Sequence, residues 1–368
     1  MGLPRVGEKS PRRLLILLPT LSGGGSERVV VTLLRHMDRS LFRLNLLVVD
    51  GSPGAYGADI PPDVDVRHLG NPRILSALPR IIMTIWRERP DVVFSTLSHL
   101  NLALAAVRPI LPRRMRLVAR ESSIVTQVIA GYRRPGWWAM AYRHFYRRLD
   151  RLVCQSRYMR DELVERYGYP IDKSVVINNP VDAERIRELA GAKAADSPER
   201  DPARIELLAV GRLSWEKGFD LLIDALALCR RPALRLTILG EGPLRGDLAL
   251  RARDQGVEGQ VTFAGFQSNP YPFFAKADAL VVSSRYEGFP NVVLEALACG
   301  TPVIATRSPG GTAEILENVP GCVLVADVSA QSLATAIAGF SGEVRVPDDA
   351  IRPYEVATIV RRYEQELT

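Results

Sequence analysis

ADALVVSSRYEGFPNVVLEALACGTPVIAT, residues 277–306, decides the fold because it holds a strand, a loop, a helix and a second strand in that order. The apolar runs in 277–284 and 301–306 are short and rich in valine, alanine and isoleucine, which favours strands. The apolar spacing between them favours a helix. A unit of this kind predicts neighbouring parallel strands joined by a crossover helix.

The loop of this unit carries its chemistry. Glu287 follows the carboxyl end of the first strand, while Pro290 and Asn291 suit the start of a helix, where proline needs no donor and asparagine caps. Free backbone N–H groups at that helix start favour an anion. Glu295, inside the helix, suits hydroxyls rather than phosphates. The pattern fits a ligand with phosphate and polyol groups, and a surface loop with two solvated glutamates stays open as the alternative.

Short apolar runs alternate with helical patterns along the whole chain, and this alternation predicts an α/β architecture with two doubly wound, Rossmann-like domains. Helices are expected at 26–37, 157–167 and 353–368, and a helix followed by an exposed linker at 183–203. The expected strands are 13–19, 44–50, 91–96, 116–120, 150–156, 174–179, 204–212, 234–240, 260–266, 277–284, 301–306 and 321–326.

We therefore expect an N-terminal acceptor-binding domain at 1–183, a C-terminal nucleotide-sugar domain at 184–350, and a helix at 351–368 that packs back toward the first domain. Doubly wound folds bind ligands at the carboxyl ends of their strands, so a two-domain version binds in the cleft between its domains.

Composition narrows the class. The 368 residues carry a formal charge of +7, but residues 1–180 hold 28 Lys and Arg against 15 Asp and Glu. This basic half suits a membrane surface, a nucleic acid or a phosphorylated substrate, or a solvated arginine-rich surface. Four isolated cysteines and four scattered histidines indicate reduced thiols and no protein-bound zinc. No apolar run reaches a membrane-spanning length, and the short apolar stretch at 14–21 is better explained as a strand before a glycine loop than as a signal peptide.

A second loop, in VGRLSWEKGFDLLIDAL at 210–226, lies between a strand and a helix. Arg212 offers a planar fork and Lys217 a point charge, and both suit a diphosphate. Gly218 lets the backbone approach closely. The loops at 240–248 and 263–269 follow the next two strands, so the candidate residues gather at one edge of the predicted sheet.

The chain resembles the retaining glycosyltransferases of family 4 (glycosyl transferases group 1), which have the GT-B fold. Its second half meets their E-x7-E spacing with Glu287 and Glu295, and their GR-L-x3-KG pattern with residues 211–218. In the first half, GGGSERVV (23–30) matches the glycine loop after the first strand, and VVINNPVD (175–182) matches the approach to the linker. The resemblance covers almost the whole chain.

The resemblance implies a retaining, metal-independent transfer of a sugar, of the hexosyl or N-acetylhexosaminyl class, from a nucleotide-diphosphate sugar, with UDP as the expected nucleotide. No cofactor is expected. Arg212 and Lys217 would neutralise the departing diphosphate, Glu287 would contact the donor sugar and Glu295 the ribose. The donor-binding residues implied are Gly24, Gly25, Arg212, Lys217, Glu241, Phe266, Gly288, Phe289, Pro290, Asn291, Val292 and Glu295. Retention is expected through front-face attack, in which the leaving phosphate takes the acceptor's proton.

The chain departs from the family at the strand 116–120. Many relatives have a histidine just after it, where this chain has Arg120 and Glu121. Glu121 is a candidate for aligning the acceptor hydroxyl and Arg120 for adding positive charge, although loop carboxylates are mostly structural. His99 is the third acceptor-side candidate, with a structural histidine as the alternative.

Residues 131–152 mix tryptophans and tyrosines with arginines, which suits a membrane interface or a helix packed on the sheet. We expect a cytoplasmic enzyme, peripheral on the inner face of the membrane, that acts on a lipid-linked glycan in surface polysaccharide or glycoconjugate biosynthesis and binds no nucleic acid. The alternatives are a sugar-nucleotide-binding protein without transferase activity, a sugar-nucleotide epimerase on the same plan, and a nucleic-acid binder. The last lacks a recognition motif.

Overall fold

The computed structural model describes residues 10–52, 54–191, 203–342 and 344–368. The chain forms two compact units: unit 1 is the chain up to Pro180 together with Val356–Thr368, and unit 2 is Val181–Glu355. The division falls at these residues because Val181 pairs with Glu355 in a parallel bridge inside unit 2. The boundaries expected from the sequence were 183 and 350.

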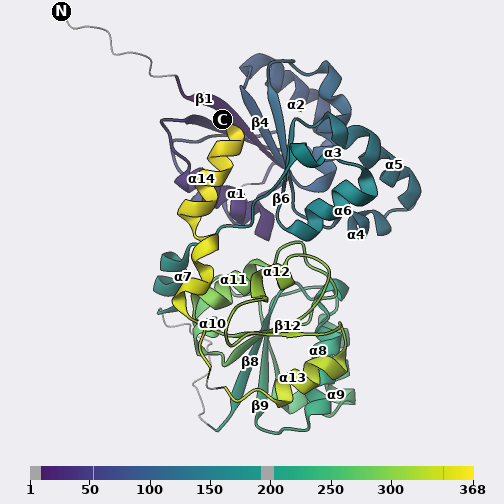
Figure 1. Cartoon of the computed structure of the whole chain (residues 1–368), viewed down its shortest axis with the longest axis vertical. Coiled ribbons are helices and arrows are strands. Elements are labelled where there is room, and N and C mark those ends of the chain that lie inside the picture. Colours follow the sequence, from purple (N-terminus) through teal and green to yellow (C-terminus); the bar gives the residue numbers. More distant parts are fainter. Residues whose placement is uncertain (1–9, 53, 192–202, 343) are drawn as a thin grey trace, which may run out of the picture. The chain divides into compact units, whose positions relative to one another are not determined.

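Unit 1 contains a parallel sheet of seven strands in the order β3-β2-β1-β4-β5-β6-β7. Figure 1 shows α1 and α14 on one side of this sheet and α2 and α3 on the other. The strands are β1 (Arg12–Leu18), β2 (Phe42–Val48), β3 (Asp65–His68), β4 (Val92–Thr96), β5 (Arg116–Glu121), β6 (Arg151–Cys154) and β7 (Ser174–Val176). The helices are α1 (Gly25–His36), α2 (Ile74–Glu88), α3 (Ser98–Val107), α4 (Val125–Ala130), α5 (Pro135–Phe145), α6 (Arg157–Tyr167) and α14 (Val356–Leu367).

The central strands of unit 1 are buried on both faces, which explains their continuous apolar runs. Every residue of β4 is buried, and so is β1 from Leu14 to Leu18. The α1 helix adds Val29, Val30, Leu33 and Leu34 to the same core. This burial is the main stabilising term, at about 25 cal/mol per Å² of apolar surface removed from water.

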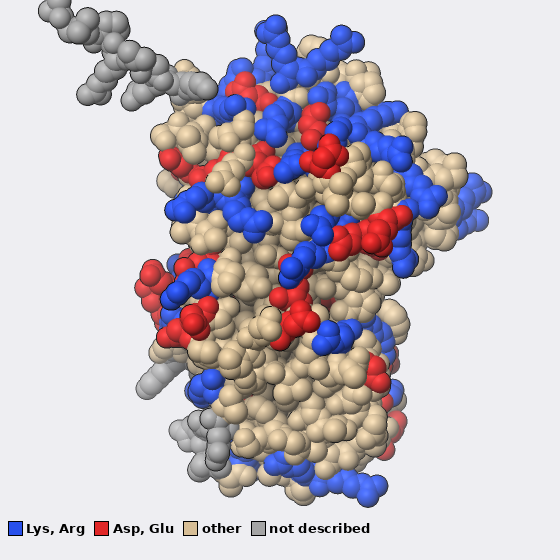
Figure 2. Space-filling model, viewed as in Figure 1, with Lys and Arg blue, Asp and Glu red and all other residues tan. Residues whose placement is uncertain are grey.

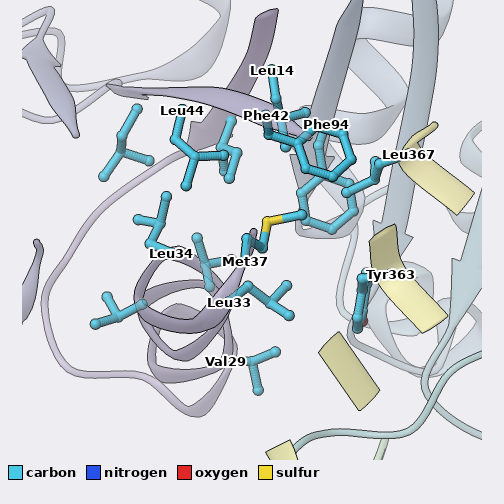
Figure 3. Close-up of a cluster of buried hydrophobic side chains, with 14 of the residues drawn as sticks. Leu14, Val29, Leu33, Leu34, Met37, Phe42, Leu44, Phe94, Tyr363 and Leu367 are labelled. Atoms are coloured by element: carbon cyan, nitrogen blue, oxygen red, sulfur yellow. The ribbon is translucent and has the colours of Figure 1, made fainter. Parts of the chain in front are cut away.

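Helix α14 completes the core of unit 1. Figure 3 shows Tyr363 and Leu367 in the same cluster as Phe94 and residues of α1, and both α14 side chains are fully buried. The Tyr363 ring packs edge-on against Phe94 with 5.8 Å between centroids. On the outer turn, Arg151 forms a two-pronged ion pair with Glu366, with nitrogen–oxygen distances of 2.6 and 2.9 Å.

Unit 2 contains a parallel sheet of six strands in the order β10-β9-β8-β11-β12-β13. Its strands are β8 (Ile205–Val210), β9 (Leu234–Leu239), β10 (Val261–Gly265), β11 (Ala279–Val282), β12 (Val303–Thr306) and β13 (Val323–Val325). Its helices are α7 (Ala183–Ala190), α8 (Phe219–Cys229), α9 (Arg245–Asp254), α10 (Tyr271–Lys276), α11 (Asn291–Ala298), α12 (Thr312–Leu316) and α13 (Ala330–Ala338). The sheet separates two hydrophobic clusters, one on each face.

The predicted fold class is confirmed: both units are doubly wound α/β sheets. Helix α7 was expected, and the linker expected after it lies in part outside the described residues. Strand β3 was missed because it is a polar edge strand without a buried residue. Helix α2 was missed too, and it contains Pro79. No helix in the described ranges is long and apolar enough to cross a bilayer.

In both units the strand order reverses direction at one point. Unit 1 reverses between β1 and β4, and unit 2 between β8 and β11, because the chain winds outward first on one side and then on the other. The loops that leave two such strands at their carboxyl ends diverge and leave a crevice where doubly wound proteins bind ligands. These two switch points are the places to look for function.

Candidate active site

The switch point of unit 2 brings together the two loops singled out by sequence. The loop after β8 carries Arg212 and Lys217, and the loop after β11 carries Glu287. Lys217 Nζ donates to Glu287 Oε1 at 2.6 Å, across 70 residues of sequence. Both side chains are largely buried, with 22% and 12% of their surfaces exposed. The sequence therefore places a matched pair of charges at the position where the fold binds ligands.

Glu287 is held by a second bond that sequence reasoning missed. The Ser284 hydroxyl donates to the same oxygen, Oε1, at 2.6 Å. The other oxygen, Oε2, has no hydrogen-bond partner in the described part of the chain, so it remains available to a ligand hydroxyl. The neighbouring Ser283 hydroxyl donates to the backbone oxygen of Lys217 at 2.9 Å. A hydroxyl directly after an apolar strand was the signal for this pair of serines.

Two glycines allow these loops to approach each other. Gly218 has φ +64°, and a Cβ there would lie 2.1 Å from the Ser283 carbonyl oxygen. Gly310, after β12, has φ +121°, and a Cβ there would lie 1.4 Å from the backbone carbonyl oxygen of Glu287. Neither position accepts a side chain without a shift of backbone. The close approach of Gly218 agrees with the role expected for it.

Arg212 is the most exposed cation of the site, since 73% of its side chain is open to solvent. It contacts Glu216 at 3.4 Å, one helical turn along. The rest of the turn is fixed by Arg285, which pairs with both oxygens of Asp220 at 2.8 and 2.7 Å and lies 4.7 Å from the Trp215 ring centroid. A well-bonded turn therefore presents one exposed guanidinium and one paired ammonium.

Helix α11 places the second glutamate of the E-x7-E spacing. Glu295 lies one turn into the helix and is 5% exposed. Pro290 is the N-cap residue and Asn291 the first helical residue, so the expectation that Asn291 caps the helix is wrong. Pro290 fixes the extended backbone that the capping position requires.

The remaining predicted donor residues are distributed around this edge. Phe289 is buried and packs on Tyr354, 5.9 Å between centroids, so its ring belongs to the core. Gly288 accepts a hydrogen bond from the Gly311 amide at 3.0 Å, and Val292 is half-buried. Glu241 follows β9 and is exposed; Phe266 follows β10 and is 74% exposed. Both lie at the carboxyl edge of the same sheet.

The switch point of unit 1 has a different content. The glycine loop after β1 bends back on itself, because the Glu27 carboxylate accepts the Gly23 and Gly24 amides at 2.8 and 2.6 Å and the Thr20 hydroxyl. The amide of Gly24, an expected donor-binding residue, is thus engaged by Glu27, which is 4% exposed. Gly25 begins α1. A glutamate three residues after the N-cap was the available signal.

Two of the acceptor-side candidates are internal. Arg120 is fully buried and donates to the Tyr363 hydroxyl, Thr96 Oγ1 and Asn179 Oδ1 at 3.1, 3.2 and 2.7 Å. Its guanidinium therefore lies within the fold rather than at a surface. The reason is that β5 is an inner strand of the sheet, covered on both faces.

Glu121 is also fully buried. Its carboxyl group accepts the Ser98 hydroxyl, the Tyr146 hydroxyl at 2.7 Å and the amides of Ser122 and Ser123. Burial raises the pKa of this carboxyl, and the hydrogen bonds lower it in part. The group therefore ties three elements of unit 1 together.

His99 is the third acceptor-side candidate, and it lies at the surface as the second residue of α3, after β4. Partial desolvation lowers the pKa of its imidazole. Leu97, two residues before His99 at the N-cap of α3, has φ +76°, a rare conformation for a bulky residue. Of the three candidates, His99 alone is exposed. Within the described ranges, no cluster of three or more His, Cys, Asp or Glu residues is arranged for a metal ion.

Two doubly wound units, one of them with a lysine–glutamate pair and an exposed arginine at its switch point, define a transferase of the GT-B fold. Solved structures agree on the fold. The chain aligns over 97% of its length with 99% of Anabaena HepE in complex with UDP and glucose, at 20% identity and a TM-score of 0.76. It aligns over 98% with a glycosyltransferase from Rickettsia africae, at 17% identity and a TM-score of 0.77.

Sequence comparisons give the family. Residues 23–185 match the model of Glycosyltransferase Family 4, and residues 204–341 match that of Glycosyl transferases group 1. The chain belongs to these family 4-like, group 1 glycosyltransferases, and it is a glycosyltransferase, which confirms the resemblance.

Two curated relatives show how far the similarity extends. The Rhizobium meliloti lipopolysaccharide core biosynthesis glycosyltransferase LpsE is 39% identical in an aligned region that covers 45% of this chain and 46% of LpsE. A Campylobacter jejuni N-acetylgalactosaminyltransferase that acts on an N-acetylgalactosamine-bearing diphospho-undecaprenol is 28% identical over 83% of both chains.

Proposed function

We propose that this glycosyltransferase moves a sugar from a nucleotide-diphosphate sugar, held by unit 2, to a glycan or lipid-linked acceptor. The observation that carries the proposal is the Lys217–Glu287 pair at the β8/β11 switch point, with Arg212 exposed beside it. Two cations suit a diphosphate, and the unpaired Glu287 oxygen suits a sugar hydroxyl. Glu295, one turn into α11, is assigned to the ribose.

The reaction breaks the bond between the anomeric carbon and the diphosphate oxygen and forms one from that carbon to an acceptor oxygen. Arg212 and Lys217 stabilise the negative charge that develops on the leaving diphosphate, which is the role a metal ion fills in other enzymes. The proposal is a metal-independent, retaining transfer. The acceptor attacks from the side of the leaving group, whose phosphate oxygen receives the acceptor's proton.

The substrates are proposed from the relatives. HepE was solved with UDP and glucose, which supports a UDP-sugar. The Campylobacter enzyme acts on a diphospho-undecaprenol carrier, and LpsE acts in lipopolysaccharide core biosynthesis, which supports a lipid-linked acceptor in glycoconjugate synthesis. Such an enzyme would work at the cytoplasmic face of a membrane, in peripheral contact through its basic unit 1.

A thermal-shift screen tests the donor proposal. The protein is heated with UDP, GDP, ADP and their common sugars in the presence of a chelator. A ligand that binds the native state alone raises the melting temperature, by the equivalent of about 2.7 kcal/mol at a concentration 100 times its Kd. We expect one nucleotide to raise it and the shift to vanish in Arg212→Ala and Glu295→Ala.

A shift that persists in both variants would place the nucleotide elsewhere and overturn the site. If the unaltered protein and Glu287→Ala both bind the nucleotide but transfer no sugar to any acceptor preparation, a sugar-nucleotide-binding protein without transferase activity would be favoured. Conversion of the free sugar nucleotide to its epimer would favour an epimerase.

A further inference from the structure

One segment of unit 1 has a single sign of charge. Between Glu121 and Asp150 the chain has five arginines and a histidine but no acidic residue. The segment contains α4, α5 and the 3-10 turn Tyr146–Arg148. Figure 2 shows Lys and Arg side chains gathered at the edge of unit 1 where Figure 1 shows α5. We call the exposed residues of this segment the α5 face.

The α5 face combines these charges with large apolar side chains. Helix α5 buries Ala141 and Tyr142 against unit 1, but it leaves Trp137 60% and Met140 66% exposed, three residues apart on the outer side. Two arginines stand at the start of the helix. Arg133, Arg134, Trp137 and Trp138 line an open pocket of about 370 Å³. The two indole rings meet edge to face, 5.2 Å apart.

The arginines of this face lack acidic partners in the structure. Across the described part of the chain, no carboxylate lies within ion-pair distance of the five arginines at 133, 134, 143, 147 and 148. Arg143 and Arg147 donate instead to the backbone oxygens of Arg166 and Gly168. Elsewhere on unit 1, Arg39 pairs with Asp63 and Arg35 with Asp59. The α5 face is therefore an unneutralised cationic surface with an apolar centre.

We propose that the α5 face docks on an anionic lipid bilayer. Indole rings prefer the depth of the headgroups, and guanidinium groups bind lipid phosphates in pairs of hydrogen bonds. Trp137 and Met140 enter the interface, while Arg133 and Arg134 bind phosphates beside them. A helix parallel to the surface suits this contact. The inference deepens the proposed function, because an acceptor anchored in lipid requires the enzyme at the bilayer.

The experiment measures sedimentation of the full chain with vesicles of phosphatidylcholine, with or without 30% phosphatidylglycerol. The variant R133Q/R134Q removes two charges from the α5 face. The control R113Q/R114Q removes another pair of neighbouring, exposed arginines from the same unit, just before β5. We expect the first to weaken binding to anionic vesicles about 20-fold and the control less than threefold, because the attraction acts within a Debye length.

A second variant, W137A/M140A, tests the apolar centre. We expect it to weaken binding about tenfold and to abolish the blue shift of tryptophan fluorescence that anionic vesicles induce. W86A is its control, an exposed tryptophan on α2. Equal binding of R133Q/R134Q and R113Q/R114Q would overturn the proposal.

Tight RNA binding lost in R133Q/R134Q, without vesicle binding, would overturn it in favour of a nucleic-acid face. The nucleotide thermal shift, measured on the same samples, separates the two proposals. Vesicle binding that fails while the UDP shift persists rejects the α5 face alone, and the reverse rejects the donor site alone.

Discussion

The two switch points of this glycosyltransferase share a fold position but not a chemistry. At β8/β11 in unit 2, a lysine and a glutamate face each other and an arginine is open to solvent. At β1/β4 in unit 1, the carboxylate of Glu27 accepts hydrogen bonds from the amides of Gly23 and Gly24. On the strand next to β4, Arg120 and Glu121 are fully buried. The same topology therefore supports the proposed ligand-binding edge in one unit and an internally bonded edge in the other.

This difference between the two switch points distinguishes polar groups that are hydrogen-bonded within the protein from polar groups that are open to a ligand. In unit 1 the buried side chains of Glu27, Arg120 and Glu121 are bonded to other parts of the protein, so we expect their removal to act on stability. In unit 2, Glu287 Oε2 has no hydrogen-bond partner in the described residues and the Arg212 side chain is 73% exposed, so we expect their removal to act on binding and rate. Four substitutions test this division, and the first has the largest expected effect.

Glu287→Gln should lower the rate of transfer by about a thousandfold, because it removes the charge that pairs with Lys217 and that we propose contacts the donor. The measurement is kcat for nucleotide release with a membrane extract as the acceptor source. Glu258→Gln, an exposed glutamate in the same unit, is the control and should change kcat less than twofold. A Glu287→Gln protein with the normal melting temperature and a normal rate would end the assignment of this edge as the active site.

Arg120→Met should cost about 3–5 kcal/mol of the free energy of unfolding of unit 1, because three buried oxygens lose their donor at once. Urea unfolding followed by circular dichroism measures the change. Tyr363→Phe removes one of the three bonds and should cost about 1 kcal/mol. A stable Arg120→Met protein with reduced turnover would instead give Arg120 a role at a surface.

Ser284→Ala should lower kcat about five- to tenfold with little change in KM, because the variant frees Glu287 Oε1 from a hydrogen bond worth about 1–1.5 kcal/mol. Ser284→Thr retains the hydroxyl and should restore most of the rate. The control is Ser329→Ala, which removes the N-cap of α13 in the same unit. It should lower stability by about 1 kcal/mol and leave kcat unchanged. Equal kinetic effects of the two alanine variants would make Ser284 a structural residue.

Glu121→Gln should change how stability depends on pH. Burial raises the pKa of Glu121 in the folded state, so its contribution is fully present below the unfolded value of about 4.5. That contribution is lost as pH rises through the folded value. We expect the unaltered protein to lose stability relative to Glu121→Gln as the pH rises. The measurement is the melting temperature of both proteins from pH 4 to pH 8. Parallel curves for the two proteins would show that Glu121 has no raised pKa.

Short-range patterns in the sequence were enough to predict the inner strands. They also led to the candidate residues at the β8/β11 switch point of unit 2, but not to the bonded groups at the switch point of unit 1. Apolar runs identified the strands, and the charged residues of the loops after β8 and β11 identified Arg212, Lys217 and Glu287 as candidates. The parallel arrangement then brings those loops to one edge, so the Lys217–Glu287 contact is a consequence of topology.

The features that the sequence did not reveal depend on partners far along the chain. Arg120 and Tyr363 are 243 residues apart, and no local pattern distinguishes a buried arginine from a loop cation. Glu27 was overlooked because glycines beside it suggested phosphate binding. Strand β3 has polar ends and no buried residue, so its pairing with β2 cannot be seen in its own composition.

Helix α14 imposes an order on biosynthesis. Its residues Tyr363 and Leu367 belong to the core of unit 1, but the ribosome makes them after every residue of unit 2. Domains usually fold in the order of their synthesis. Here unit 1 is the first to begin, but it still exposes the apolar surface that α14 will cover after every residue of unit 2 has been made. Until α14 packs, the unit that begins first is the one with an incomplete core.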